Sequence, residues 1–253
     1  MEFGERIIQR GMTGADVAEL QMRLAGFRGT LPDGVFGPGT ELQVVQFQRD
    51  FMKQNPPSGI VDGDTMRATE AFARQYPIDF ESLKCPCGVC SGFGRGLFKG
   101  KYYSNGPKIE RNYRYEYPGI HRMLLWAVRA VYFYHPEYEF SITSGYRCSE
   151  RNRQKGRTST NHCGKAVDFD VPLEAGEDKR DDMERCDRIR GRIVEFANAQ
   201  IGWYAANRKA LEPSDLAPTW IHMDVRCYER NYLADRYFCT TLETLDNQKE
   251  IEV

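Results

Sequence analysis

Apolar positions in the first 75 residues recur at the three- and four-residue spacing of amphipathic helices. Three such stripes follow one another: Val17, Leu20 and Leu24, then Val44, Phe47 and Phe51, then Ala68 and Phe72. Gly26 suits the end of the first helix. The pattern predicts a small three-helix bundle.

Two similar loops connect the predicted helices. Residues 33–40 read Asp-Gly-Val-Phe-Gly-Pro-Gly-Thr, and residues 59–65 read Gly-Ile-Val-Asp-Gly-Asp-Thr. An Asp-Gly turn running into a threonine therefore occurs twice, which is typical of a loop entering a helix. Thr13 with Asp16 and Thr40 with Gln43 have capping-box spacing, so we expect helices to begin at these threonines.

The pattern changes after residue 76. Residues 76–118 are rich in Gly, Pro, Tyr and Cys, and a strongly apolar helix is predicted from Met123 to Val131. Strands are predicted over 138–146, 166–171 and 220–226, and a charged helix over 177–200 with a buried stripe of Met183, Cys186, Ile189, Ile193 and Phe196. No glycine-rich phosphate loop follows a strand, so we expect an α+β domain with a mainly antiparallel sheet. We divide the chain into residues 1–78 and 79–253.

Composition and charge exclude several classes of protein. The 253 residues are 41% hydrophobic and 12% aromatic, which is enough for a packed core. The net charge of −1 argues against a strongly basic nucleic-acid binder. The longest unbroken apolar run, Met123–Val128, is far shorter than the roughly 20 residues of a membrane-spanning helix. We therefore expect neither a nucleic-acid partner nor a membrane span. We also expect a monomer.

Four short motifs punctuate the N-terminal helices: Arg10-Gly11-Met12-Thr13-Gly14, Leu20-Gln21, Asp33-Gly34-Val35-Phe36-Gly37-Pro38 and Phe47-Gln48. In this order they resemble the peptidoglycan-binding three-helix module of bacterial cell-wall hydrolases. The resemblance spans nearly all of residues 6–75 and implies that this part of the chain binds peptidoglycan. The alternative is a helical bundle without a ligand, because most of these positions also have structural roles as turns, caps or core.

Histidine is scarce, and two of the four histidines lie near aspartates of the predicted strands. His162 lies in a polar loop just before the strand that carries Asp168, and His222 lies in the middle of the last strand. Catalytic zinc takes three protein ligands, usually nitrogen or carboxylate oxygen, and leaves one position for water. The residues therefore predict a zinc site formed by His162, Asp168 and His222. The alternative for each histidine is a hydrogen-bonded structural role.

The surrounding motifs resemble a known family. Ser144-Gly145-Tyr146-Arg147 comes first, then His162 with Gly164-x-Ala166-x-Asp168, and finally His222. This order resembles the zinc D-alanyl-D-alanine peptidases, whose metallopeptidase superfamily also contains the hedgehog fold. The resemblance covers roughly residues 82–230 and implies that the two histidines and Asp168 bind Zn²⁺. It further implies that Arg147 holds either the developing oxyanion or the substrate carboxylate.

Two features depart from the family pattern. Only Cys163 separates His162 from Gly164, where the family has two residues. Trp220 and Thr219 occupy the positions where many members carry the general base.

The general base must therefore come from elsewhere. We assign this role to Glu212, in the loop that enters the last strand, with Asp224 and Asp215 as alternatives. Asp224 could equally orient a histidine. A solvated or capping role is the alternative for each of these acids.

The eight cysteines all lie after residue 78 and favour an oxidising compartment or a metal site. Cys85-Pro86-Cys87-Gly88-Val89-Cys90 is a tight cluster, but zinc sites usually come from two paired knuckles, and no second CxxC exists. We therefore favour disulfides over a structural zinc, including a hypothetical Cys148–Cys163 bridge. A nucleophilic Cys163 is a further alternative.

A basic stretch flanks the predicted site: Arg147, Arg151, Arg153, Lys155, Arg157 and Lys165. These residues either form a solvated loop or attract anionic wall polymer and stem carboxylates to the site.

Together these patterns predict a zinc-dependent peptidoglycan hydrolase. Residues 1–78 would bind the wall, and residues 79–253 would cleave stem peptides as a D,D-carboxypeptidase or endopeptidase. The alternatives are a non-catalytic wall-binding protein with a degenerate peptidase domain and a hedgehog-like signalling module, which the wall-binding resemblance disfavours. A wall substrate implies a periplasmic or secreted protein. No apolar segment follows residues 1–6, so we expect that the signal was removed or that the protein is exported otherwise, as an effector or a phage lysin.

Overall fold

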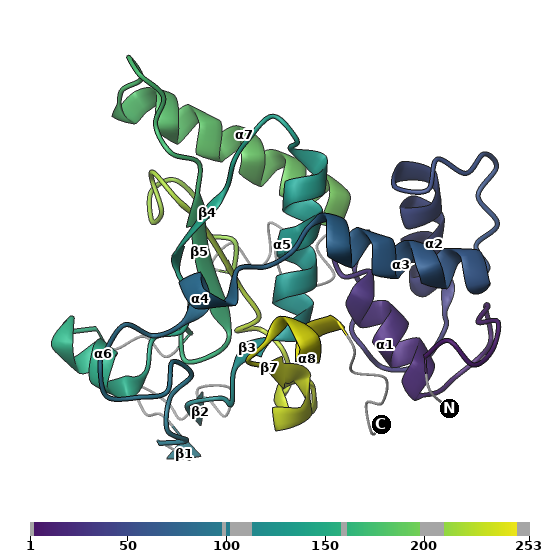
Figure 1. Cartoon of the computed structure of the whole chain (residues 1–253), viewed down its shortest axis with the longest axis horizontal. Coiled ribbons are helices and arrows are strands. Elements are labelled where there is room, and N and C mark those ends of the chain that lie inside the picture. Colours follow the sequence, from purple (N-terminus) through teal and green to yellow (C-terminus); the bar gives the residue numbers. More distant parts are fainter. Residues whose placement is uncertain (1–2, 98–99, 102–112, 158–160, 198–209, 247–253) are drawn as a thin grey trace.

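A computed structural model describes residues 3–97, 100–101, 113–157, 161–197 and 210–246. The fold is α+β, with three N-terminal helices on one side of a central helix and small antiparallel sheets beyond it (Figure 1). The three N-terminal helices are α1 (Ala15–Arg23), α2 (Pro38–Asp50) and α3 (Gly63–Gln75). The predicted bundle and the predicted fold class are confirmed.

Two buried glutamines hold the two similar loops in the same way. The Gln21 side chain bonds to the backbone of Gly34 and Val35 and to the Thr40 hydroxyl. The Gln48 side chain makes the corresponding bonds to Gly59, Ile60 and Thr65. The internal repeat thus extends to the side chains that fix each loop against the preceding helix.

The two predicted capping boxes are wrong. Gly14 and Gly37 are the N-cap residues of α1 and α2, and neither helix has a side-chain cap. The Thr13 backbone instead pairs with Val35 across the loop, and the Thr40 hydroxyl is engaged by a glutamine. The loop contacts therefore override the local capping signal. At α3, the Asp62 carboxylate does cap the helix by accepting the N–H of Thr65.

The remaining elements form three small antiparallel sheets and several helices. The three-stranded sheet has the order β4 (Ser141–Ser144), β5 (Ala166–Asp170) and β6 (Ile221–Asp224). Two-stranded sheets pair β1 (Gly100–Lys101) with β2 (Tyr113–Arg114) and β3 (Ile120–His121) with β7 (Phe238–Cys239). The helices are α4 (Phe80–Leu83), α5 (Arg122–Tyr134), α6 (Ser149–Gln154), α7 (Lys179–Ala197), α8 (Leu242–Asp246) and the 3₁₀ turns η2 (Arg230–Leu233) and η3 (Asp235–Tyr237).

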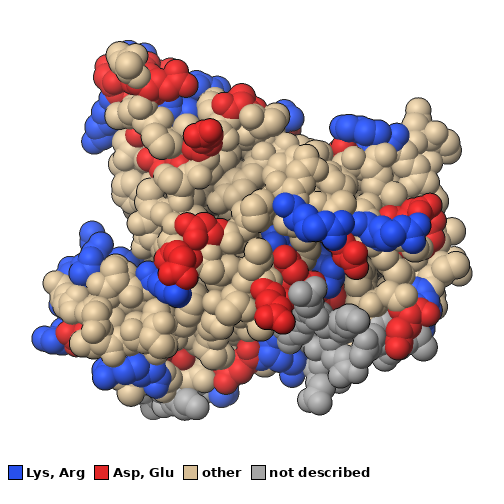
Figure 2. Space-filling view, viewed as in Figure 1, with Lys and Arg blue, Asp and Glu red and all other residues tan. Residues whose placement is uncertain are grey.

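Most sequence predictions for this half agree with these elements. The predicted strands are present but shorter, and the apolar helix is α5. The predicted stripe of α7 is buried except for Met183, which is partly exposed, and residues 198–200 lie outside the described part of the chain. Figure 2 shows charged side chains gathered over α6 and the N-terminal part of α7.

Helix α5 forms the centre of one continuous hydrophobic core. It packs against α1, and its aromatic side chains meet those of the N-terminal helices, with Phe72 and Trp126 ring centroids 6.4 Å apart. At Gly26 an added Cβ would lie 2.1 Å from the Ala130 Cβ. Gly26 is not in the left-handed conformation of a helix-ending glycine, so it serves this close approach rather than the helix end.

A buried ion pair crosses the predicted boundary at residue 78. The two terminal guanidinium nitrogens of Arg122, Nη1 and Nη2, donate to the Glu19 carboxylate at 2.7 and 2.8 Å. The side chains of Arg122 and Glu19 are fully buried. Arg23 bonds to the same carboxylate at 2.7 Å, and Arg122 also bonds to the carbonyl of Leu245 in α8. Removing one member of such a network leaves a buried charge unpaired, which typically costs about 3–5 kcal/mol.

Within the described residues, no helix combines the length and the apolar character needed to cross a membrane.

Candidate metal centre

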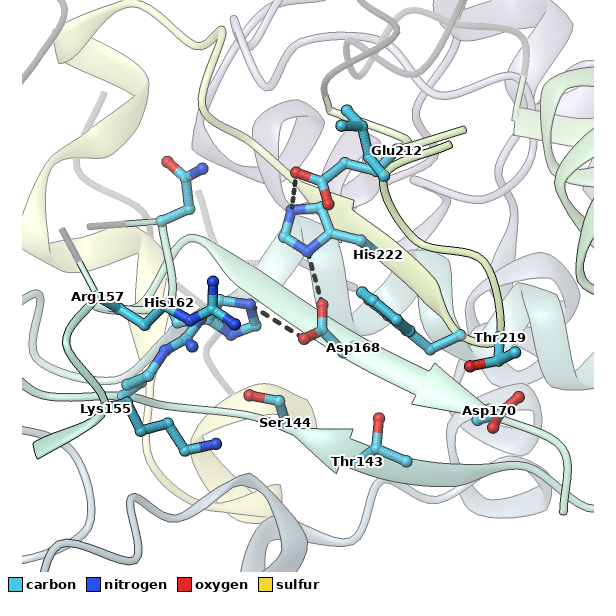
Figure 3. A pocket seen from close by; sticks show the side chains of 14 residues that line it. Thr143, Ser144, Lys155, Arg157, His162, Asp168, Asp170, Glu212, Thr219 and His222 are labelled. Atoms are coloured by element: carbon cyan, nitrogen blue, oxygen red, sulfur yellow. Dashed lines mark hydrogen bonds and ion pairs between the residues drawn. The ribbon is translucent and has the colours of Figure 1, made fainter. Parts of the chain in front are cut away.

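The three-stranded sheet brings the three predicted zinc ligands together. Asp168 on β5 lies directly opposite His222 on β6, and His162 approaches from the loop that precedes β5 (Figure 3). The Asp168 carboxylate lies 2.6 Å from His222 Nδ1 and 3.3 Å from His162 Nε2. One ligand atom from each residue lies within 4.8 Å of the others. The short spacing between His162 and Gly164 therefore does not prevent convergence.

Each histidine is oriented by a bond at its other ring nitrogen. His162 Nδ1 lies 2.9 Å from the Gly145 carbonyl oxygen, and His222 Nε2 lies 2.8 Å from an Asp224 oxygen. An acceptor at one nitrogen fixes the tautomer that presents the other nitrogen to a metal. The donor set of two imidazoles and one carboxylate is that of hydrolytic zinc sites, so these residues fit a zinc ion.

The electrostatics of the cluster favour a cation. Burial opposes ionisation of Asp168, but hydrogen bonds from His162 and His222 hold the pKa of its carboxyl well below the ordinary value. Burial also opposes charge on His222, yet its bonds to Asp168 and Asp224 raise its pKa to about 9. The carboxylates around His222 therefore favour a positive charge at this position.

The two acids assigned to catalysis have different surroundings. Glu212 lines the pocket, and its Oε1 lies 3.9 Å from His222 Nε2 and 3.0 Å from Arg226 Nη2. Asp224 is fully buried and bonds to His222 and Arg226, an arrangement that fits the alternative role of orienting the histidine. Asp215 is exposed and is not among the described residues that line the pocket.

Part of the basic stretch also reaches the pocket. Arg147, Lys155 and Arg157 line it, and Figure 3 shows Lys155 and Arg157 on the same side as His162. Burial lowers the pKa of Arg147, and the nearby Asp168 carboxylate opposes that shift. Two other members of the stretch are not among the described residues that line the pocket. Arg153 pairs with Glu150 on the surface of α6, and Lys165 is buried.

Sequence reasoning missed two residues of this site. Arg226 contacts Glu212 and Asp224, and its Nη2 lies 3.0 Å from His222 Nε2. It continues the alternation of His222 and Asp224 by two further residues, and that periodicity could have revealed it. Asp170 also lines the pocket, and it follows Asp168 by two residues, so the alternation of side chains along a strand could have revealed it too. Burial raises the pKa of Asp170 to about 6.

The prediction of disulfides is wrong. All eight cysteines lie in the described part of the chain, and none of them forms a disulfide. The Sγ of Cys163 lies 3.2 Å from the Arg147 carbonyl oxygen, whereas that of Cys148 lies with Cys85, Cys87 and Cys90. Cys163 is 2% exposed, and burial raises its pKa to about 12, so it lacks the thiolate character of a nucleophile.

Comparison with known proteins identifies the N-terminal part of the chain. Residues 13–68 match the family described as "Putative peptidoglycan binding domain". The match runs from the turn before α1 into α3 and includes both glutamine-held loops, so this part is a domain of the peptidoglycan-binding type. No peptidase family is identified for the pocket residues. No curated protein matches the chain.

Proposed function

We propose that the protein is a zinc-dependent peptidoglycan hydrolase that cleaves stem peptides. The observation that carries the proposal is the convergence of His162, Asp168 and His222 at a pocket that also contains Arg147 and Glu212. A domain of the peptidoglycan-binding type on the same chain supplies the substrate class.

Zinc held by these three residues would supply the Lewis acid that polarises a carbonyl and acidifies a water. Glu212 is the proton acceptor, because its carboxylate faces the pocket beside His222. Arg226 holds that carboxylate in place through a 3.0 Å ion pair. The proton that Glu212 receives would pass to the leaving amine as the peptide bond breaks.

The basic side chains of the pocket select an anionic substrate. The Arg147 guanidinium suits either the oxygen that becomes negative or a terminal carboxylate, because its N–H groups form a fork. Lys155 and Arg157 add positive charge on the same side. Stem peptides of peptidoglycan carry such carboxylates, so cleavage at or near their D-alanyl end fits this pocket.

The N-terminal helices would keep the enzyme at its substrate. Residues 13–68 would bind peptidoglycan while the pocket acts on neighbouring stems. This role places the protein where it meets the cell wall, in the periplasm or outside the cell, either as a cell's own enzyme, as an effector or as a phage lysin.

Mass spectrometry of stem fragments released from purified sacculi tests the proposal. We expect wild-type protein to release defined fragments, chelation to abolish release, and His162→Ala or His222→Ala to lose metal and activity together. Arg153→Gln, on the outer face of α6, is the matched control and should retain both.

Full turnover by metal-free protein would overturn the proposal. A chain that holds zinc at the histidine site and binds sacculi but releases no fragment would support the non-catalytic alternative instead.

A further inference from the structure

Four cysteine sulfurs converge at a second place in the C-terminal part of the chain. The Sγ atoms of Cys85, Cys87, Cys90 and Cys148 all lie within 4.8 Å of one another. Three of these side chains are buried, and Cys90 is partly buried. The first three belong to one short loop and the fourth belongs to a segment far along the chain, so tertiary folding brings them together.

The backbone around the cluster is closed and well defined. The Cys85 N–H donates to the Gly92 carbonyl at 2.8 Å, which closes the loop that carries three of the cysteines. Cys148 is the N-cap residue of α6. The fourth sulfur is therefore supplied by the start of a helix that is far from the cysteine loop in the sequence.

Backbone N–H groups point at three of the sulfurs. Cys87 Sγ accepts from the N–H groups of Val89 and Cys90, at 3.4 and 3.3 Å. Cys85 Sγ accepts from the Cys148 N–H, and Cys148 Sγ accepts from the Arg151 N–H, each at 3.4 Å. Such donors stabilise sulfur as thiolate, which is the form that binds metal.

Four thiolates at one point form a complete tetrahedral donor set. Closed sites with four cysteine ligands are typical of structural zinc, whereas catalytic zinc keeps a position for water. We propose that Cys85, Cys87, Cys90 and Cys148 bind a structural zinc ion that is separate from the histidine site. This site gives a function to four of the eight cysteines, none of which takes part in the proposed hydrolysis.

The proposed zinc would fix the wall of the pocket. The segment before the cysteine loop already packs on the end of β4, because the Tyr146 N–H donates to the Leu83 carbonyl at 2.7 Å. At Gly145 an added Cβ would lie 2.4 Å from the Leu83 Cα, so this contact leaves no room for a side chain. Arg147 follows directly and precedes Cys148. A metal that holds Cys148 to the cysteine loop would therefore hold the backbone on both sides of Arg147.

Metal analysis in a background without the histidine site tests this proposal alone. The protein carrying His162→Ala and His222→Ala is purified under reducing conditions and its zinc is measured. We expect one equivalent, which further substitution of Cys87→Ser and Cys90→Ser should remove. Cys227→Ser, at an exposed cysteine outside the cluster, is the matched control and should retain the zinc.

Cobalt substitution keeps the test decisive if the double serine variant does not fold. Cobalt in the same background should show intense sulfur-to-metal charge-transfer absorption, and Cys90→His should keep one bound cobalt with a weaker charge-transfer band. A folded, reduced protein that takes up neither metal would overturn the proposal. So would a Cys87–Cys90 disulfide in native protein that takes up no cobalt after reduction. Cleavage of sacculi is not part of this readout, so failure of the proposed hydrolase leaves it unaffected.

Discussion

The cysteine cluster and the histidine cluster are both groups of side chains that could hold a metal ion, yet they differ in what surrounds them. The cysteine cluster offers four sulfurs, and none of these cysteines is among the described residues that line the pocket beside the histidines. The histidine cluster offers three ligands and opens onto that pocket, which is lined by acids and bases. Four protein ligands are typical of a structural metal site, whereas three protein ligands beside a pocket are typical of a catalytic metal site. The number of donors and their access to solvent thus separate the two roles better than ligand type alone.

Replacing Glu212 with glutamine should have the largest effect on this comparison. Loss of the proton acceptor should lower kcat by about 10²–10⁴-fold while the zinc content stays unchanged. Fragment release from sacculi and metal analysis on the same preparation check this. Asp215→Asn is the control, because Asp215 lies in the same loop and is not among the described residues that line the pocket. Equal loss in both variants would mean that Glu212 is not the base.

The two clusters can be compared only at pH values at which the protein stays folded, and the folded state should lose stability in acid. Burial lowers the pKa of His121 from 6.5 to about 4, although its bond to the Tyr232 carbonyl opposes that shift. Between those values the unfolded chain binds a proton that the folded chain excludes. The contribution of His121 to the free energy of unfolding should therefore fall by about 3 kcal/mol as the pH drops through this window, and stay level above it.

Urea unfolding of zinc-saturated protein at several pH values measures this loss. His121→Gln should flatten the acid limb. Part of the remaining slope is expected from His135, whose pKa is also lowered by burial. Carboxyl groups contribute as well: burial opposes ionisation of Glu116, but its hydrogen bonds lower its pKa, so its contribution is lost in acid. Identical limbs for His121→Gln and wild type would contradict the assignment.

Asp224→Asn should weaken the histidine site without touching the cysteine site. The carboxylate that orients His222 becomes an amide, so zinc affinity at the histidine site should fall about 10–100-fold. Competition with a chromophoric chelator should then release one zinc more readily and leave a thiolate-bound zinc in place. Release of both metals together would show that the two sites are coupled.

The smallest effect is expected at the rim of the pocket. Arg157→Gln removes one positive charge facing the substrate, so KM should rise by up to about fivefold while kcat stays unchanged. The difference from wild type should shrink at high salt, because screening weakens the attraction that the wild type uses. Initial rates at two ionic strengths decide this, and a salt-independent difference would favour a packing role for Arg157.

The sequence allowed the local parts of the structure to be predicted. The helical stripes of α1 and α2 and the alternation along β6 give the elements directly, and two strands carrying Asp168 and His222 pair as expected for ligands of one site. The sequence left three roles open for Asp224, namely general base, orientation of a histidine, and a solvated or capping role, because burial of that carboxylate depends on the whole sheet.

The remaining features depend on contacts between distant segments. Cys148 joins Cys85, Cys87 and Cys90 only after α4 packs on the end of β4, and no local spacing encodes that approach. The capping boxes failed for a similar reason, because Gln21 engages the Thr40 hydroxyl from another helix. Local rules describe a segment in water, whereas these side chains are satisfied by the rest of the fold.

The contact between Gly26 and α5 bears on how such proteins can be recombined. A binding domain on a loose tether can be exchanged as a cassette, since its partner is complete without it. Here Trp126 and Phe133 of α5 pack directly on aromatic rings of the N-terminal helices, and the Arg122 charge is compensated by Glu19. Excision of those helices would leave an apolar surface and an unpaired charge on the remaining domain. Transplanting the N-terminal helices onto another enzyme would therefore require either that α5 is moved with them or that the faces packed on α5 are redesigned.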